Sequence, residues 1–332
     1  MKPSFGLSSR PVRFRQIARS LLFLTIACAV FAAAAQSQAP PNGTQSNNET
    51  AVQSDMPPWI RAANERALAA RAKPANTPAG SDASADLALG VVTPQFSVAA
   101  DKFVSPQGVA VDATGDLYVA DSDLQQVFKV TPGGERSIVG SGFMVPQAVA
   151  VDGAGNVYVA DSQAGVIYKV TPGGVQGTVG SGFYMPMSVA VDAAGNVYAA
   201  DPWNDFVAQI MPDGTQTNVG SGYNTPVGVA VDALGNVYVA DTYSAAVFKI
   251  TTDGTQTTLG NGLVAPMYVA VDPEGDLYVT DTGTNSLAEI TSQGTLTTVR
   301  SGLDVPIGVA LDASGDLYVA DSFSEKVIKV EP

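Results

Sequence analysis

The sequence contains no histidine and only one cysteine, Cys28. The absence of histidine closes every mechanism that depends on an imidazole as a metal ligand or as a proton carrier. Cys28 lies in an apolar run near the N-terminus. If this run is removed on export, the mature protein has no thiol and no disulfide, so its stability has to come from its core.

Positive charge is scarce as well. Residues 1–35 contain five Lys and Arg and no acid, so the rest of the chain holds 12 Lys and Arg against 31 Asp and Glu, a formal charge of 12 − 31 = −19. A surface of this charge repels phosphate backbones. We therefore expect no nucleic-acid partner, whereas basic targets or cations fit better.

The N-terminus has the pattern of a secretory signal peptide. A basic stretch precedes an apolar run from Leu21 to Ala35, which ends in Ala33-Ala34-Ala35 before Gln36. The run is shorter than the roughly 20 residues of a spanning helix. We predict a signal peptide over 1–35, no membrane insertion of the mature chain, and export to the periplasm or the extracellular space. A faint lipoprotein box leaves a lipid anchor at Cys28 as the alternative.

Residues 36–94 are rich in Ala, Pro, Asn, Ser and Gln. A segment of this composition cannot bury enough apolar surface to offset the entropy lost on ordering. We predict a disordered linker here.

From residue 95 onward the sequence is periodic, which decides the fold. A proline marks the same place in six units spaced by forty residues: Pro106, Pro146, Pro186, Pro226, Pro266 and Pro306. Each unit contains four short strands, a to d, separated by turn residues such as Pro132-Gly133-Gly134. Strand b, Leu117–Ala120 in the first unit, shows no polar alternation, so both of its faces are expected to be buried. Strand d is more polar, as suits an outermost edge strand.

The two ends of this region complement each other. The sixth unit stops after its strand c, and the missing strand d appears at residues 95–98, which align with residues 135–138 of the first unit. Pairing the ends in one sheet closes a ring and removes a free edge. The sequence therefore predicts an all-β fold over 95–332: a six-bladed β-propeller of four-stranded blades, closed by the N-terminal strand pairing with the last blade.

The unit resembles the NHL repeat. The string Val-Ala-Val-Asp-x-x-Gly-Asn-Val-Tyr-Val-Ala-Asp occurs at 149–161 and 229–241, with close variants in the other four units. The region is similar to the extracellular propeller of bacterial receptor Ser/Thr kinases, although no kinase domain is present. NHL units often carry an arginine just before strand c. Its loss here, together with the acidic charge, argues against the RNA-binding role of some animal NHL proteins.

Two aspartates recur in every unit, and they allow two interpretations. One set comprises Asp112 and its equivalents, and the other comprises Asp121, Asp161, Asp201, Asp241, Asp281 and Asp321. They could form a cation site or an acid–base set. We favour turn capping, because six copies of one environment do not separate the pKa values of an acid and a base. The repeated tyrosines, of which Tyr118 is the first, are expected to pack between blades.

Residues that break the repeat are better candidates for function. The loops between strands b and c and the connections from strand d to the next strand a should share one face. Aromatic and Met side chains gather there on blades three to five. The alternatives are an exposed recognition patch and six independent loops with chance aromatics, and we favour the recognition patch. The candidate ligand-binding residues are Tyr184, Met187, Trp203, Asp205, Phe206, Tyr223, Tyr243, Met267, Tyr268 and Phe323.

Three functions are compatible with these patterns. The first is a monomeric, non-catalytic binding or scaffold module for a protein, peptide or glycan, with no cofactor and no metal. The second, implied by the resemblance to propeller lactonases and lyases, is a calcium-dependent enzyme that uses Asp, Asn and Glu as ligands. The apolar, nearly identical strands a argue against it. A passive envelope component cannot be separated from the first by sequence.

Overall fold

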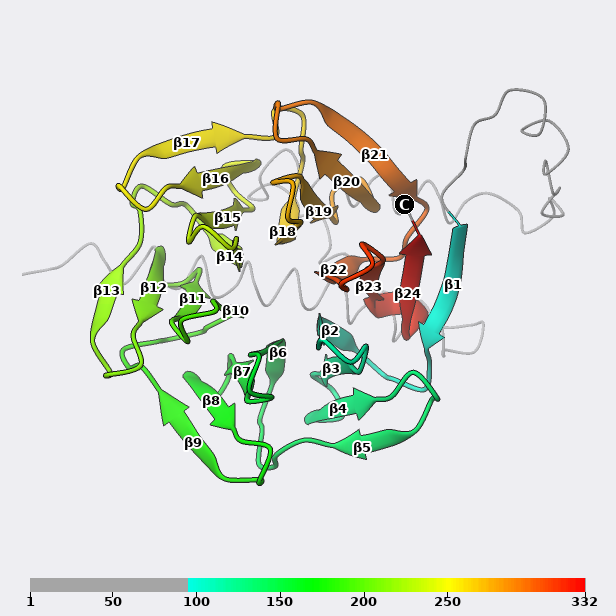
Figure 1. Ribbon diagram of the computed structural model, residues 1–332. Helices are drawn as coiled ribbons and strands as arrows, with labels where there is room; N and C mark the ends of the chain where they lie inside the picture. The colour runs from blue at the N-terminus through cyan, green and yellow to red at the C-terminus, as the bar shows by residue number, and fades with distance from the viewer. Residues whose placement is uncertain (1–94, 332) are drawn as a thin grey trace, which may run out of the picture. The chain divides into compact units, whose positions relative to one another are not determined.

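A computed structural model describes residues 95–331 of the chain. The predicted signal peptide, 1–35, and the predicted linker, 36–94, lie outside the described residues. Within the described part, no helix is long and apolar enough to cross a membrane. Six separate four-stranded antiparallel sheets follow one another around a ring, in the order of the chain (Figure 1).

The two inner strands of every blade come first in each repeat. The innermost strands, a, are β2 (Pro106–Val111), β6 (Pro146–Val151), β10 (Ser188–Val191), β14 (Pro226–Val231), β18 (Pro266–Val271) and β22 (Pro306–Leu311). The second strands, b, are β3 (Leu117–Asp121), β7 (Val157–Asp161), β11 (Val197–Asp201), β15 (Val237–Asp241), β19 (Leu277–Asp281) and β23 (Leu317–Asp321).

The two outer strands complete each sheet. The third strands, c, are β4 (Gln126–Val130), β8 (Val166–Val170), β12 (Phe206–Ile210), β16 (Ala246–Ile250), β20 (Ser286–Ile290) and β24 (Lys326–Glu331). The outermost strands, d, are β5 (Arg136–Ile138), β9 (Gln176–Val179), β13 (Gln216–Asn218), β17 (Gln256–Leu259), β21 (Leu296–Ser301) and β1 (Gln95–Ala100). A short 3₁₀ turn, η2 (Ser322–Ser324), joins β23 to β24.

Burial follows the predicted order of the strands. All five residues of β3, β7, β11, β15 and β19 are buried. This agrees with their sequences, which consist mainly of Val, Ala and Tyr with no polar alternation. Strands b are sandwiched between neighbouring blades, so both faces lose water. Strand β5 is exposed along its length and β17 nearly so, which confirms the polar edge strands.

The ring closes as predicted. Strand β1 pairs antiparallel with β24, with Gln95 opposite Glu331 and Val98 opposite Ile328. The last sheet therefore has the order β1-β24-β23-β22 and combines the two ends of the described region (Figure 1). Closure of this kind leaves no blade with an unpaired inner strand.

An arginine reinforces the junction between blades one and six. Arg136 donates to the carbonyl oxygens of Asp101 (3.3 Å) and Lys102 (3.0 Å), and its guanidinium lies 3.8 Å from the centre of the Phe128 ring. At three other junctions a glutamine takes this place. Gln176, for example, accepts from the Ser141 N–H (3.0 Å) and donates to the Ser141 carbonyl (2.9 Å). The closing junction thus combines hydrogen bonds with a cation–π contact.

The core consists of interfaces between blades. One buried cluster joins Tyr118 and Ala120 of blade one to Phe143 and Val149 of blade two. Equivalent clusters contain Tyr198 and Tyr238. Inter-blade packing is therefore confirmed for these tyrosines, and each contributes a large apolar ring to two adjacent blades.

At Gly108 and Gly228 the innermost strands approach the next blade so closely that they leave no room for a Cβ atom. A Cβ atom added at Gly108 would lie 2.6 Å from the Ala148 Cα and 2.7 Å from the Gln147 carbonyl oxygen of the next blade. At Gly228 it would lie 2.4 Å from the Met267 carbonyl oxygen. These distances are shorter than van der Waals contact, so the inner strands fix both the spacing of the blades and the identity of these residues.

We predict that Gly108→Ala destabilises the ring while Gly153→Ala does not. The first substitution overpacks the interface between two inner strands and should cost about 1–3 kcal/mol. Gly153 has open space around its Cβ position, and four of the other blades carry alanine there. Thermal unfolding measures both. Equal melting temperatures for the two variants would contradict the close approach at Gly108.

Candidate functional site

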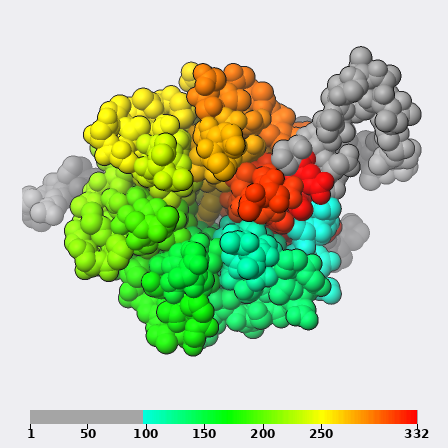
Figure 2. All heavy atoms as spheres, viewed as in Figure 1, coloured from blue at the N-terminus to red at the C-terminus, as the bar shows by residue number. Residues whose placement is uncertain are grey.

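The ring has two faces, formed by different parts of the repeat. The loop face consists of the loops between strands b and c and of the ends of the connections that lead into strands a. The turn face consists of the turns between strands a and b. In Figure 2 the six blades follow one another as contiguous blocks of atoms around the axis. A ligand on the face in view can therefore meet side chains from several blades.

A buried carboxylate holds each part of the loop face in place. Asp161, at the end of β7, accepts hydrogen bonds from the N–H groups of Met144 (2.7 Å) and Val145 (3.0 Å) in the incoming connection. It also accepts one from Ala164 (3.1 Å) in the following loop. Its side chain has no solvent exposure. One carboxylate thus ties together two segments that the sequence separates, as an aspartate at a turn can do.

The same arrangement recurs at Asp121, Asp201, Asp241, Asp281 and Asp321, each of which accepts at least one backbone N–H from its incoming connection. Turn capping, the interpretation favoured for these acids, is confirmed. Their oxygens face backbone donors, and they form the frame on which the loop face is built.

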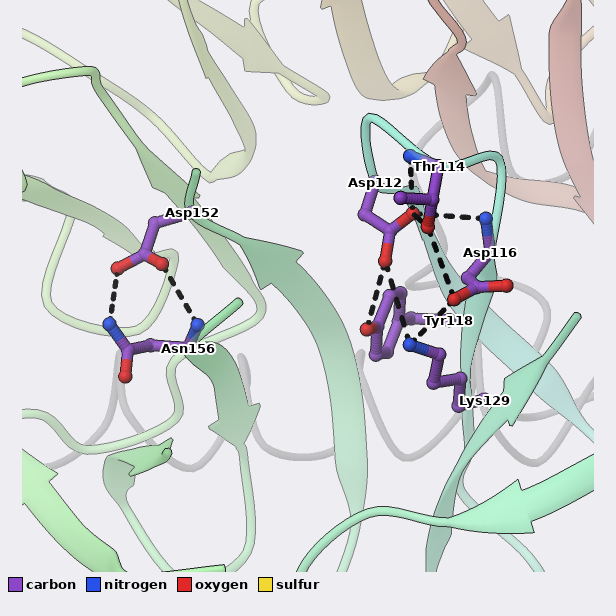
Figure 3. A network of polar contacts seen from close by, with 7 residues as sticks. All are labelled: Asp112, Thr114, Asp116, Tyr118, Lys129, Asp152 and Asn156. Carbon is purple, nitrogen blue, oxygen red and sulfur yellow. Dashed lines mark hydrogen bonds and ion pairs between the residues drawn. The ribbon is translucent and has the colours of Figure 1, made fainter. Parts of the chain in front are cut away.

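The aspartates of the turn face cap turns as well. Asp112 accepts from the N–H groups of Thr114 (2.9 Å) and Asp116 (3.0 Å) and from the Tyr118 hydroxyl (3.1 Å) (Figure 3). Lys129 forms an ion pair with Asp116 at 2.6 Å. In blade two, the side-chain amide of Asn156 donates to Asp152 at 2.8 Å. These hydrogen bonds and ion pairs hold each turn against the adjacent strands of its blade.

Burial and hydrogen bonding shift the pKa values of these acids in opposite directions. Burial alone would raise the pKa of Asp152, but hydrogen bonds from Asn156, Tyr158 and Ala154 outweigh it and hold the pKa below its ordinary value. Burial dominates at Asp241 and raises its pKa despite hydrogen bonds from Asn224 and Ser244. Asp152 and Asp241 therefore differ in their electrostatics although both cap turns.

A hollow of about 540 Å³ lies on the turn face between blades one, five and six. Its walls include Asp112, Asp272, Glu274 and Asp312. Among residues 95–331, no group of three or more His, Cys, Asp or Glu residues is arranged to hold a metal ion. The three aspartates of this hollow accept backbone hydrogen bonds in turns, as Asp312 does from the N–H groups of Ser314 (2.8 Å) and Asp316 (3.0 Å).

Tyr268 occupies the axis of the ring, which the sequence did not reveal. It belongs to β18 in blade five, yet its hydroxyl contacts the carbonyl oxygens of Met187 in blade three and Gln147 in blade two. The residue is buried, and burial raises the pKa of its hydroxyl. Where the other inner strands carry Gly, Ala or Ser, this side chain crosses the centre. The expectation that Tyr268 is an exposed contact residue is wrong.

Three more candidates are buried, contrary to the expected exposed patch. Trp203 is only 7% exposed, because its ring lies under that of Tyr184 with the centroids 5.9 Å apart and the planes at 21°. Tyr223 fills the core position that Phe103 and Phe143 hold in other blades, and its hydroxyl donates to Val219. Met267 is buried beside Thr242. Each of these three side chains packs against a neighbouring blade or loop.

The remaining candidates stay accessible to different degrees. Tyr184 is 57% exposed, and its ring rests on Trp203. The half-buried candidates are Met187, Asp205, Phe206, Tyr243 and Phe323. Phe206 stacks on Phe183 at 5.9 Å, so the aromatic side chains of blade three form two adjacent stacks.

Sequence reasoning missed three exposed apolar residues that lie near Tyr184 on the loop face. Val104, Leu124 and Met144 are 46%, 38% and 43% exposed. Val104, Met144 and Tyr184 occupy the same repeat position, directly after the core residue of the connection. Aligning this position through the six units gives Val104, Met144, Tyr184, Asn224, Val264 and Asp304. This alignment was the feature of the sequence from which Val104 and Met144 could have been recognised.

Six four-stranded sheets around a filled axis define a six-bladed β-propeller. The family model described as the NHL repeat matches two of the repeats, at residues 103–129 and 223–250. Both matches span a complete inner part of a blade, from the core residue of the connection to strand c. A comparison of the chain with curated proteins found no match.

Solved structures of similar fold include two classes of enzyme. A virginiamycin B lyase from Staphylococcus aureus is 13% identical, with a TM-score of 0.58, over 72% of this chain and 99% of the lyase. A gluconolactonase from Xanthomonas campestris is 15% identical, with a TM-score of 0.64, over 74% of this chain and 92% of that chain. A Bacteroides thetaiotaomicron protein of unknown function is 17% identical, with a TM-score of 0.60, over 72% and 76%. Identities this low show the shared fold.

We predict that the carboxyl groups of Asp152 and Asp241 titrate on opposite sides of the ordinary Asp value of 3.8. Because the pKa of Asp152 is lowered by folding, its contribution to stability is present above pH 3.8 and is lost as the pH falls through the folded pKa. Because the pKa of Asp241 is raised, its contribution is present below pH 3.8 and is lost as the pH rises through the folded pKa. Carbon-detected NMR titration measures both.

The Asn156 amide provides the control for this titration. Asn156→Ala should raise the pKa of Asp152, because it removes a hydrogen bond to the carboxylate. Asn196→Ala, the same change in blade three, should leave Asp152 unaltered. Titration of Asp152 above 3.8 in the parent protein would contradict the capping network.

Proposed function

We propose that this chain is an exported, non-catalytic binding module that presents its loop face to a protein, peptide or glycan. The observation that carries the proposal is the unequal distribution of exposed apolar side chains over six otherwise equivalent blades. Val104, Leu124, Met144 and Tyr184 lie on blades one to three. Exposed apolar clusters on one part of a surface are typical of interaction sites.

Export forms part of this proposal because of the sequence before the ring. The basic stretch and the apolar run of residues 1–35 are typical of a signal peptide. A propeller exported behind such a signal would meet its ligand in the periplasm or outside the cell. The assignment stays a prediction, since these residues lie outside the described part of the chain.

An enzyme is the second candidate, favoured by the fold similarity to lyases and gluconolactonases. Two features of this chain weigh against the lyase reaction. A lyase variant in which a histidine is replaced by alanine is described as catalytically inactive, and this chain contains no histidine. In addition, Tyr268 fills the axis between the inner strands, so a substrate would have to bind on the surface of the ring.

We predict position-specific cross-linking from the loop face. A photoreactive benzophenone side chain introduced in place of Met144 or Tyr184 should form a discrete adduct with the native ligand in cells that produce the protein. The same side chain at Leu234 should not. Leu234 is apolar and lies on the turn face, and at 80% it is more exposed than Met144 (43%) and Tyr184 (57%), so poor access cannot explain a missing adduct there. Gel shifts and mass spectrometry of the adduct are the measurements.

Two outcomes would contradict the proposed function. One is cross-linking at Leu234 that equals cross-linking at Met144 and Tyr184. The other is the absence of any adduct at either loop-face position although both variants fold, as judged by unchanged thermal unfolding.

A further inference from the structure

The exposed apolar residues of the loop face lie in a row along three consecutive blades. The loop of each blade lies against the connection of the next. Gln125, beside Leu124, donates to the Met144 carbonyl at 3.0 Å, and the Cβ position of Gly165 lies 3.4 Å from the Tyr184 carbonyl oxygen. Val104, Leu124, Met144 and Tyr184 therefore follow one another across three blades, and we call them the apolar strip.

The apolar strip covers only part of the circumference of the ring. The equivalent positions on blades four and six carry exposed Asn224 and Asp304, and Val264 of blade five is half-buried. The strip thus presents apolar groups at one position per blade along half of the circumference. An extended polypeptide, whose side chains project at regular intervals, fits such a row.

The strip is held rigidly before any ligand arrives. The backbone N–H groups of Val104, Met144 and Tyr184 donate hydrogen bonds to buried carboxylates at 2.8, 2.7 and 2.6 Å. The Tyr184 ring is also supported by Trp203. Little conformational entropy would be lost on binding, so a modest apolar contact can contribute fully to affinity.

The charge around the strip determines which polypeptide it suits. Residues 95–331 contain eight Lys and Arg against 26 Asp and Glu, a formal charge of 8 − 26 = −18. Four of the eight cations, Lys129, Lys169, Lys249 and Lys329, lie over the tyrosines behind the turn face. On the loop face, Asp123 is exposed beside Leu124. Lys102 and Lys326 each directly follow an acid in the chain. Electrostatic complementarity therefore favours a basic partner.

We propose that the apolar strip binds an extended polypeptide segment in which apolar side chains alternate with Lys or Arg. This inference rests on the proposed binding function and specifies its ligand. Apolar side chains of the segment contact Met144 and Tyr184, while its cations face Asp123 and the net negative charge of the ring. A glycan is disfavoured because three of the four side chains in the strip are aliphatic and offer no hydrogen-bond partner for sugar hydroxyls.

The test uses the full chain and two labelled synthetic peptides of equal length. One alternates lysine with leucine and the other alternates glutamate with leucine. Fluorescence polarisation should show binding of the Lys–Leu peptide, with an affinity about tenfold or more above that of the Glu–Leu peptide and falling with salt. The double variant Met144→Ser, Tyr184→Ser should weaken Lys–Leu binding about tenfold or more. Leu234→Ser, at a more exposed apolar position on the turn face, should leave it unchanged.

Several outcomes would overturn the inference. These are equal affinities for the two peptides, no binding of the Lys–Leu peptide, or an equal loss from Leu234→Ser. A further one is binding of a chitin oligosaccharide that the double variant abolishes while Lys–Leu binding survives. If the peptide test fails while position-specific cross-linking at Met144 and Tyr184 succeeds, the ligand class is wrong and the binding function stands. If both fail, the binding function itself is wrong.

Discussion

The loop face depends on one interaction, the set of backbone hydrogen bonds to a buried aspartate at the end of each strand b. In blade two, the three N–H groups that Asp161 accepts come from two segments about twenty residues apart in the sequence. A hydrogen bond to a charged acceptor is worth more than a neutral one, and burial without partners would be costly. The carboxylate and the backbone therefore specify each other, and the loop has a single conformation.

Because of this frame, the groups that hold the loop face together differ from the side chains that a ligand could contact. Its donors are backbone N–H groups, so the side chains attached to them can vary from blade to blade without disturbing it. Val104, Met144, Tyr184 and Asn224 occupy equivalent positions, and each backbone N–H bonds to its aspartate at 2.6–2.8 Å. A repeat of this kind can change its surface at little cost to the fold, which is how six similar blades can present an asymmetric face.

The axis obeys a stricter constraint, and blade five departs from it in a coordinated way. The inner strands leave room for Gly, Ala or Ser, but Tyr268 stands in blade five. Its neighbour in β19 is Thr280, where the other blades have alanine. The Thr280 hydroxyl accepts from the Tyr268 N–H (3.1 Å) and donates to the Ile307 carbonyl (2.5 Å). One large side chain thus fills the space that six small ones would leave, and a paired polar residue satisfies the backbone around it.

The repeats in the sequence were enough to predict the features that all six blades share. They were not enough to predict whether an individual side chain is buried or exposed. Six copies of one pattern predicted the strands, the closing role of residues 95–98, the capping aspartates and the packing tyrosines. The repeats could not show that Trp203 lies under Tyr184 or that Tyr268 crosses the axis, because both depend on space left by residues far apart in the chain. Val104 and Met144 were overlooked because an exposed position varies in residue type and resembles an ordinary loop.

The most direct test of this account compares Asp161→Asn with Met144→Asn, two changes on either side of one hydrogen bond. Asp161→Asn replaces one of the two carboxylate oxygens by an NH2 donor, so at least one of the backbone N–H groups loses its acceptor, at a cost of about 1–3 kcal/mol. Met144→Asn alters only an exposed side chain and should stay within about 0.5 kcal/mol of the parent. Chemical denaturation gives both free energies of unfolding. A large loss for Asp161→Asn alone is the predicted result, and equal losses would contradict a frame built on the buried carboxylate.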